Sequence, residues 1–300
     1  MKEFPVNREG NMQAETGVGR ILDLIDQERQ RLGYSGRELS MRTGLGVGTI
    51  NRILNKQGAD AARWYFCSSS APWLPSRFSD SAVSEIQRKF LGTLWNTYAF
   101  YVMYANIDGF DPSGISIDDC VLTVMDHWIL SKLNTLIGAV DEKMTAYDIT
   151  GSSRMMESFV DELSNWYVRR CRDRYWGTEM TPDKTAAYMT LYTTLERLIR
   201  LAAPFVPFIT ESIYQNLVRR TSQDAPISVH MCDFPVMETD RIDPELEKRM
   251  DVAQKIVFLG RACRNQSSIK NRQPLSKLYA VSPTELSEEY LAIIREELNV

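Results

Sequence analysis

One stretch of the chain, DELSNWYVRRCRDRYW at residues 161–176, constrains the fold more than any other. Successive residues of an α-helix lie about 100° apart around its axis, so a helical projection sorts this stretch into faces. One side collects apolar or weakly polar side chains: Val160, Leu163, Tyr167, Cys171 and Tyr175. A helix with such a stripe must bury it against other elements, and the sequence therefore predicts a helical bundle.

The opposite side of that helix is cationic and carries one large ring. It holds Arg169, Arg172 and Trp176, with Asp173 beside them, while Arg170 and Arg174 flank the apolar stripe one turn apart. Guanidinium groups fixed next to a flat ring suit a phosphate backbone and unstacked bases, so this face is a candidate RNA-binding site. The alternative is a solvated face whose arginines pair with nearby carboxylates, those of Asp161, Glu162 and Asp173.

Apolar residues recur at helical spacing along most of the remaining chain, which predicts a mainly α fold. Helices are expected at residues 58–66, 81–106, 121–144, 153–176, 183–203, 208–219, 245–266 and 288–298. Pro204 and Pro207 should interrupt this pattern, because proline lacks the amide hydrogen and clashes with the preceding helical turn. Residues 275–281 are expected to form a strand.

The N-terminal part has a pattern of its own. The segment SGRELSMRTGLGVGTINRILN at 35–55 predicts a short helix, a turn at Gly44 and a second helix. It resembles the helix-turn-helix of phage-repressor-like transcription factors, whose second helix enters the major groove of DNA. The resemblance implies that Thr49, Asn51 and Arg52 would face DNA. The alternative is a helical cap without a DNA-binding role.

Four further segments carry a second resemblance, and they occur in a definite order. They are GADAARWYFCSSSAPWLPSRFS (58–79), FVDELSNWYVRRCRDRYW (159–176), LERLIRLAAPFVPFITESIYQNL (195–217) and GRACRNQSSIKNRQPLSKL (260–278). Together they resemble the isoleucyl-tRNA synthetase family over about residues 57–300. In that family the first segment follows the catalytic domain and its lysine-rich ATP loop. The second and third lie in the helical anticodon-binding domain, and the fourth leads into a C-terminal extension.

The resemblance implies a fold class and a division of the chain. The fold would be mainly α, a class Ia synthetase anticodon-binding helical bundle with a small N-terminal helix-turn-helix and a truncated C-terminal α/β extension. The expected parts are a disordered tail (1–18), a helix-turn-helix-like segment (19–57), a remnant of the segment that follows the catalytic domain (58–79), the bundle (80–250) and the start of the C-terminal extension (251–300).

Catalytic residues are not expected in this chain. Class I synthetases activate the amino acid with a His-x-Gly-His element and a Lys-Met-Ser-Lys-Ser-like loop. The chain has only two histidines, His127 and His230, and neither lies in such an element. No lysine-rich loop precedes Gly58. We therefore expect the chain alone to be inactive and to bind no cofactor, since ATP and Mg²⁺ would belong to the missing catalytic domain.

Composition narrows the class of protein further. A formal net charge of −4 means that any RNA contact must come from a local basic face rather than from a basic whole. Besides 169–176, the C-terminal part offers such a cluster, of which Lys270 and Arg272 are the candidate RNA contacts and Arg261, Arg264 and Lys277 are neighbours. Five cysteines without a C-x-x-C pair indicate reduced thiols in a cytosol and no metal site. No secretory segment or membrane span is expected.

Three hypotheses follow. The first is a tRNA-binding fragment of an isoleucyl-tRNA synthetase that binds the anticodon stem-loop of tRNA-Ile, with a separate catalytic subunit as a possible partner. The second is a helix-turn-helix DNA-binding regulator that uses the synthetase-like bundle as a tRNA sensor or dimerisation platform. The third is a recombined gene product without a selected function, because the sequence changes character abruptly near Gln57.

Overall fold

The computed structural model describes residues 57–71, 74, 78–282 and 284–300. The predicted tail and nearly all of the predicted helix-turn-helix, including Thr49, Asn51 and Arg52, lie outside the described residues. Within the described part the regular structure is helical, and no strand occurs there. The expectation of a mainly α bundle is confirmed.

The described helices fall into three groups along the chain. The first group is α4 (Ala59–Ser68), α5 (Asp80–Ile86), the π-helical turn η1 (Gln87–Gly92), α6 (Thr93–Asp108) and α7 (Val124–Thr145). The second group is α8 (Ile149–Glu162), the π-helical turn η3 (Leu163–Val168), α9 (Arg169–Cys171) and the 3₁₀ turn η4 (Arg172–Tyr175). The last group is α10 (Pro182–Ala202), α11 (Pro207–Tyr214), the π-helical turn η5 (Gln215–Arg219), α12 (Pro244–Gln266) and α13 (Glu288–Leu298), with short 3₁₀ turns at Ile117–Asp119, Val229–Met231 and Thr239–Arg241.

Local sequence signals account for where the helices begin and end. Thr123 and Asp126 form a capping box at the start of α7. Thr181 and Asp243 cap α10 and α12, and in both a proline takes the first helical position. Gly109 ends α6 in the left-handed conformation, at a φ of 63°.

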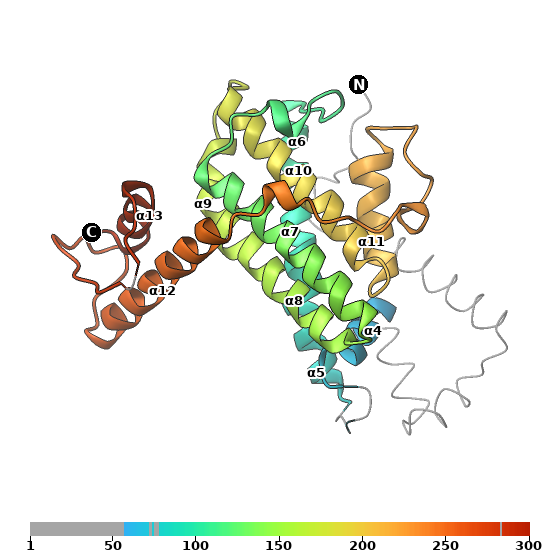
Figure 1. The fold of residues 1–300 in the computed structure, drawn as a ribbon, viewed down its shortest axis with the longest axis horizontal. Helices are drawn as coiled ribbons and strands as arrows, with labels where there is room; N and C mark the ends of the chain where they lie inside the picture. The colour runs from blue at the N-terminus through green and yellow to red at the C-terminus, as the bar shows by residue number, and fades with distance from the viewer. Residues whose placement is uncertain (1–56, 72–73, 75–77, 283) are drawn as a thin grey trace, which may run out of the picture.

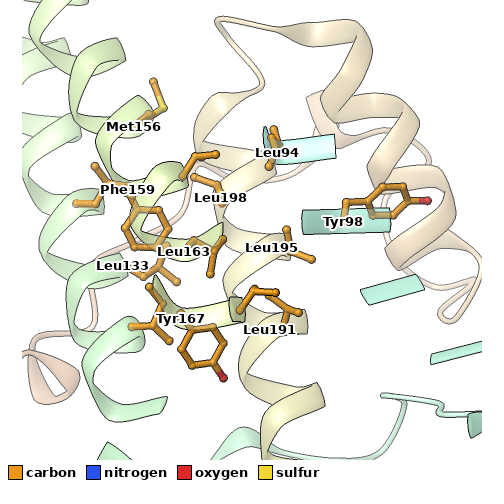
Figure 2. Packing of buried hydrophobic residues seen from close by; sticks show 14 of the residues in the cluster. Leu94, Tyr98, Leu133, Met156, Phe159, Leu163, Tyr167, Leu191, Leu195 and Leu198 are labelled. Carbon is orange, nitrogen blue, oxygen red and sulfur yellow. The ribbon is translucent and has the colours of Figure 1, made fainter. Parts of the chain in front are cut away.

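The core lies between helices that run side by side in the bundle (Figure 1). Leu133 of α7, Phe159 of α8, and Leu163 and Tyr167 of η3 meet the α10 leucines (Figure 2). Leu94 and Tyr98 of α6 lie on the far side of α10 in the same view. The labelled residues are all buried.

The interruption predicted at Pro204 and Pro207 is confirmed. Helix α10 ends at Ala202 and α11 begins at Pro207. The turn between them is held by α4, because Arg63 donates to the carbonyls of Pro204 and Phe205 at 2.9 and 3.0 Å. The buried Asp60 carboxylate accepts from the amide of Ile209 at 2.7 Å, at the first turn of α11. The 58–79 segment is thereby fastened to the bundle.

The strand predicted at residues 275–281 is wrong. That segment has no regular secondary structure and includes a bend at Ser276. A backbone hydrogen bond to another segment runs from the Leu275 amide to the Asn299 carbonyl.

Helix α12 leads away from the bundle towards α13 (Figure 1). The two helices approach closely where Gly260 faces Leu298. None of the described helices combines the length and apolarity needed to cross a membrane.

Candidate nucleic-acid interface

The apolar stripe predicted for residues 160–175 is buried throughout. Its five members, Val160, Leu163, Tyr167, Cys171 and Tyr175, are each at most 4% exposed. Burial raises the pKa of the Cys171 thiol to about 12, which keeps it protonated and inert at neutral pH. The opposite face of this helical run therefore lies towards solvent, as the periodicity predicted.

Arg174 does not belong to that exposed face. Its guanidinium forms a fork on the buried carboxylate of Asp126, with Nη1 donating to Oδ1 at 2.8 Å and Nη2 to Oδ2 at 3.0 Å. Tyr167 donates to Oδ1 at 2.6 Å, and the Thr123 amide and hydroxyl donate to Oδ2 at 2.9 and 2.7 Å. This network ties the end of the helix predicted at 153–176 to the start of α7.

The next turn presents Trp176 to solvent in a fixed position. The indole is 59% exposed, and its Nε1 donates to the Tyr104 hydroxyl of α6 at 3.0 Å. The buried ammonium of Lys184 donates to the Gly177 carbonyl at 2.5 Å and pairs with Asp108 at 2.6 Å. The chain on both sides of Trp176 is thus anchored, while most of the indole remains exposed.

Arg172 is exposed on the same turn, and its side chain has no ion-pair partner within the described part of the chain. Arg169, one turn earlier, is 40% exposed and pairs with Glu297 of α13 at 2.6 Å. These two guanidinium groups and the Trp176 ring are the combination that the sequence placed on one face. A phosphate backbone and an unstacked base are ligands that such a combination can bind.

The arginines of this run do not pair with Asp161, Glu162 or Asp173. Asp161 accepts from Asn165 instead, and Glu162 pairs with Lys132 of α7 at 3.2 Å. The arginines pair instead with carboxylates of other elements, namely Asp126, Asp183, Glu296 and Glu297. The alternative, in which these arginines pair with carboxylates of their own helix, is therefore wrong.

Lys270 and Arg272 lie in the exposed loop that follows α12, where neither side chain has an ion-pair partner among the described residues. The loop is held from below by the buried Arg264, whose Nη1 donates to the carbonyls of Lys270 and Gln273 at 3.1 and 2.8 Å. Arg264 thus supports the loop and is not part of the basic surface. Arg261, another member of this cluster, pairs with Glu297.

Two residues that matter here were missed in the sequence. Trp166 is buried, and the guanidinium carbons of Arg169 and Arg170 both lie 5.9 Å from its ring centroid. Glu297 accepts hydrogen bonds from three arginines, although it lies more than 120 residues from two of them in the sequence. Nothing in the local sequence could signal Glu297, whereas the three-residue spacing of Thr123 and Asp126 was a readable capping signal.

No group of three or more His, Cys, Asp or Glu side chains that could hold a metal ion occurs in the part of the chain that the structure describes. The five cysteines are free. The arrangement offers binding groups on a rigid helical support, which suits recognition of a ligand.

Comparison with known proteins gives concordant results. The sequence model of the family described as "Anticodon-binding domain of tRNA ligase" matches residues 126–279. An isoleucine–tRNA ligase of Clostridium novyi (strain NT) is 55% identical over 249 residues, which is 83% of this chain and 24% of that protein. One from Clostridium tetani (strain Massachusetts / E88) is 54% identical over the same length, with the same two coverages.

The chain thus spans 24% of the length of these curated relatives. Among solved structures, a LeuRS–tRNA–LeuAMS ternary complex of Agrobacterium radiobacter K84 is similar at a TM-score of 0.48 and 20% identity. That similarity covers 64% of this chain and 21% of the other, and it is too weak to carry an argument.

Proposed function

Since the chain belongs to the anticodon-binding domain family of tRNA ligases, we propose that it binds the anticodon stem-loop of tRNA-Ile. The observation that carries the proposal is the turn at 172–176. There the exposed Arg172 guanidinium, which has no ion-pair partner among the described residues, and the exposed Trp176 indole lie on an anchored backbone. Identity of 55% to an isoleucine–tRNA ligase over 249 residues supports tRNA-Ile as the RNA.

In this proposal Arg172 and Arg169 contact phosphates, and the Trp176 ring stacks on a base of the loop. Lys270 and Arg272 add contacts from the loop after α12. Arginine suits the phosphate role because its planar fork matches two oxygens at once. Aromatic stacking suits an anticodon because its bases are unpaired and can be splayed out from the loop.

Aminoacylation itself is assigned to a catalytic domain outside these residues. ATP, Mg²⁺ and isoleucine would be bound there, and the present residues would contribute only the grip on the tRNA. We place this function in the cytoplasm, where the five free thiols remain reduced.

The test is a binding series with the purified chain. Affinities for tRNA-Ile, for a non-cognate tRNA and for duplex DNA are measured between about 50 and 200 mM salt, the range over which phosphate contacts weaken measurably. We expect tRNA-Ile to bind more tightly than the other two at every salt concentration. Equal affinity for both tRNAs would refute the assignment to tRNA-Ile. Preferential binding of DNA would favour the helix-turn-helix regulator in its place.

Replacing both Arg169 and Arg172 by alanine should weaken tRNA binding and lower the salt slope of log Kd by about 2, one for each lost phosphate contact. The matched control removes two cations, Arg88 and Lys89, from the π-helical turn η1. That turn continues from α5 and packs against α8, outside the 169–176 face. The control should leave the slope unchanged. Equal slopes for the two double variants would mean that the 169–176 face does not bind the RNA backbone.

A further inference from the structure

One carboxylate, that of Glu297, holds together three arginines from two helices. Arg169 Nη2 and Arg170 Nη1 donate to its Oε1 at 2.6 and 2.9 Å, and Arg261 of α12 donates to its Oε2. The Glu297 side chain is 4% exposed, so its charge is removed from water and is balanced by these guanidiniums. Its neighbour Glu296 is 70% exposed and pairs with Arg170.

The residues that follow Glu297 hold the second basic segment. The buried Arg264 donates to the carbonyls of Leu298 and Asn299, and also to those of Lys270 and Gln273. The Asn299 side chain donates to the Arg272 carbonyl at 2.9 Å. The end of α13 therefore contacts the Arg169 helix through Glu297, and it contacts the Arg272 loop two residues later.

We propose that Glu297 is a positioning residue for RNA binding, which joins the 169–176 face and the 270–272 loop into one continuous surface. This inference rests on the proposed function. Glu297 itself does not contact the RNA. It sets the direction of the Arg169 side chain and holds the two cationic segments in a fixed relation, so that both act on one RNA backbone. Binding groups hold their geometry only when supporting contacts lock them in this way.

The charge of Glu297 distinguishes two mechanisms, because they predict opposite changes in tRNA affinity when Glu297 is neutralised. A carboxylate near an RNA-binding face repels phosphates, so its neutralisation should strengthen binding if charge alone mattered. Neutralisation should also strengthen RNA binding if Glu297 competed with a phosphate for the arginines. A positioning role predicts the reverse, since the arginines would lose their common anchor while the surface became more positive.

The experiment compares Glu297→Gln with Glu296→Gln in the full chain, using tRNA-Ile and circular dichroism as a check on folding. The two variants make the same change of charge at adjacent positions of α13. We expect Glu297→Gln to bind tRNA about tenfold more weakly, the loss of one charge-assisted contact. Glu296→Gln should bind as tightly as wild type or slightly more tightly, because Arg170 retains Glu297.

Two further variants keep the proposal open to refutation if Glu297→Gln does not fold. Glu297→Asp retains the charge but is too short to reach all three arginines. Arg261→Lys retains the cation but removes the guanidinium whose Nη2 donates to Glu297 Oε2. Both should weaken binding. The positioning role is wrong if wild type binds tRNA-Ile and folded Glu297→Gln binds it as tightly as Glu296→Gln does. If Glu297→Gln does not fold, the role is wrong if Glu297→Asp and Arg261→Lys both bind as tightly as Glu296→Gln. If wild type itself does not bind tRNA-Ile, the proposed function fails instead.

Discussion

Replacing Asp126 by asparagine should lower the free energy of unfolding by about 3–5 kcal/mol at pH 7, the cost of removing one partner from a buried ion pair. The Asp126 side chain is fully buried and accepts five hydrogen bonds, from Arg174, Tyr167 and Thr123. The amide is nearly isosteric, but it carries no charge and one of its two acceptor positions becomes a donor. Arg174 would then lose its buried counter-charge and keep only the more exposed carboxylate of Asp183.

The pH dependence of this effect has a definite sign. Burial alone would raise the pKa of Asp126, but the hydrogen bonds and charge of Arg174, with those of Tyr167 and Thr123, outweigh it and hold the pKa below its usual value. A depressed pKa contributes stability that is present above the unfolded-state pKa, about 3.9, and that is lost as the pH falls through the folded-state pKa. The difference between wild type and Asp126→Asn should therefore persist from pH 7 to about pH 4 and shrink below it.

Urea unfolding at several pH values measures the difference directly. Asp119→Asn is the matched control, because Asp119 is exposed on the short turn before α7 and loses the same charge. That substitution should change stability by less than about 0.5 kcal/mol, as is usual at the surface. A cost below about 1 kcal/mol for Asp126→Asn would place the pair among those that contribute little to stability.

How much of this structure could be predicted depends on the range of the interaction. The burial of Val160, Leu163 and Tyr167 follows from helical periodicity, which is local and survives any change in the partner helices. The bounds of α13 also agree with the prediction, Glu288–Leu298. The divisions between the predicted parts of the chain remain predictions, as does the DNA-binding role of Thr49, Asn51 and Arg52.

The partners of the arginines could not be predicted, because they depend on which helices meet. Arg174 and Asp126 are 48 positions apart, and Arg169 and Glu297 are 128 apart. A helical projection shows which side a residue takes but not which carboxylate faces it. The wrong strand at 275–281 has the same origin: its residue types suit an extended backbone, but a strand also needs a neighbour to pair with.

Replacing Trp176 by alanine should weaken the binding of tRNA-Ile by about 1–3 kcal/mol, the contribution of one base stacked on an aromatic side chain. The ring is 59% exposed, so its removal costs the fold little, while Arg174 and Lys184 still hold the turn on either side. Trp176→Phe keeps a stacking surface but gives up the hydrogen bond to Tyr104. Its affinity should fall between those of wild type and the alanine variant.

A matched control is offered by Tyr147, which is 86% exposed between α7 and α8, at the other end of the helical run that leads to Trp176. Tyr147→Ala removes an exposed ring of similar size and should leave tRNA affinity unchanged. Stacking is largely independent of charge, so Trp176→Ala should keep the salt slope of wild type, in contrast to the double arginine variant. A reduced slope for Trp176→Ala would mean that the ring acts by holding Arg172 in place. Unchanged affinity would remove Trp176 from the RNA-binding surface, because a base stacked on the indole cannot lose its platform without cost.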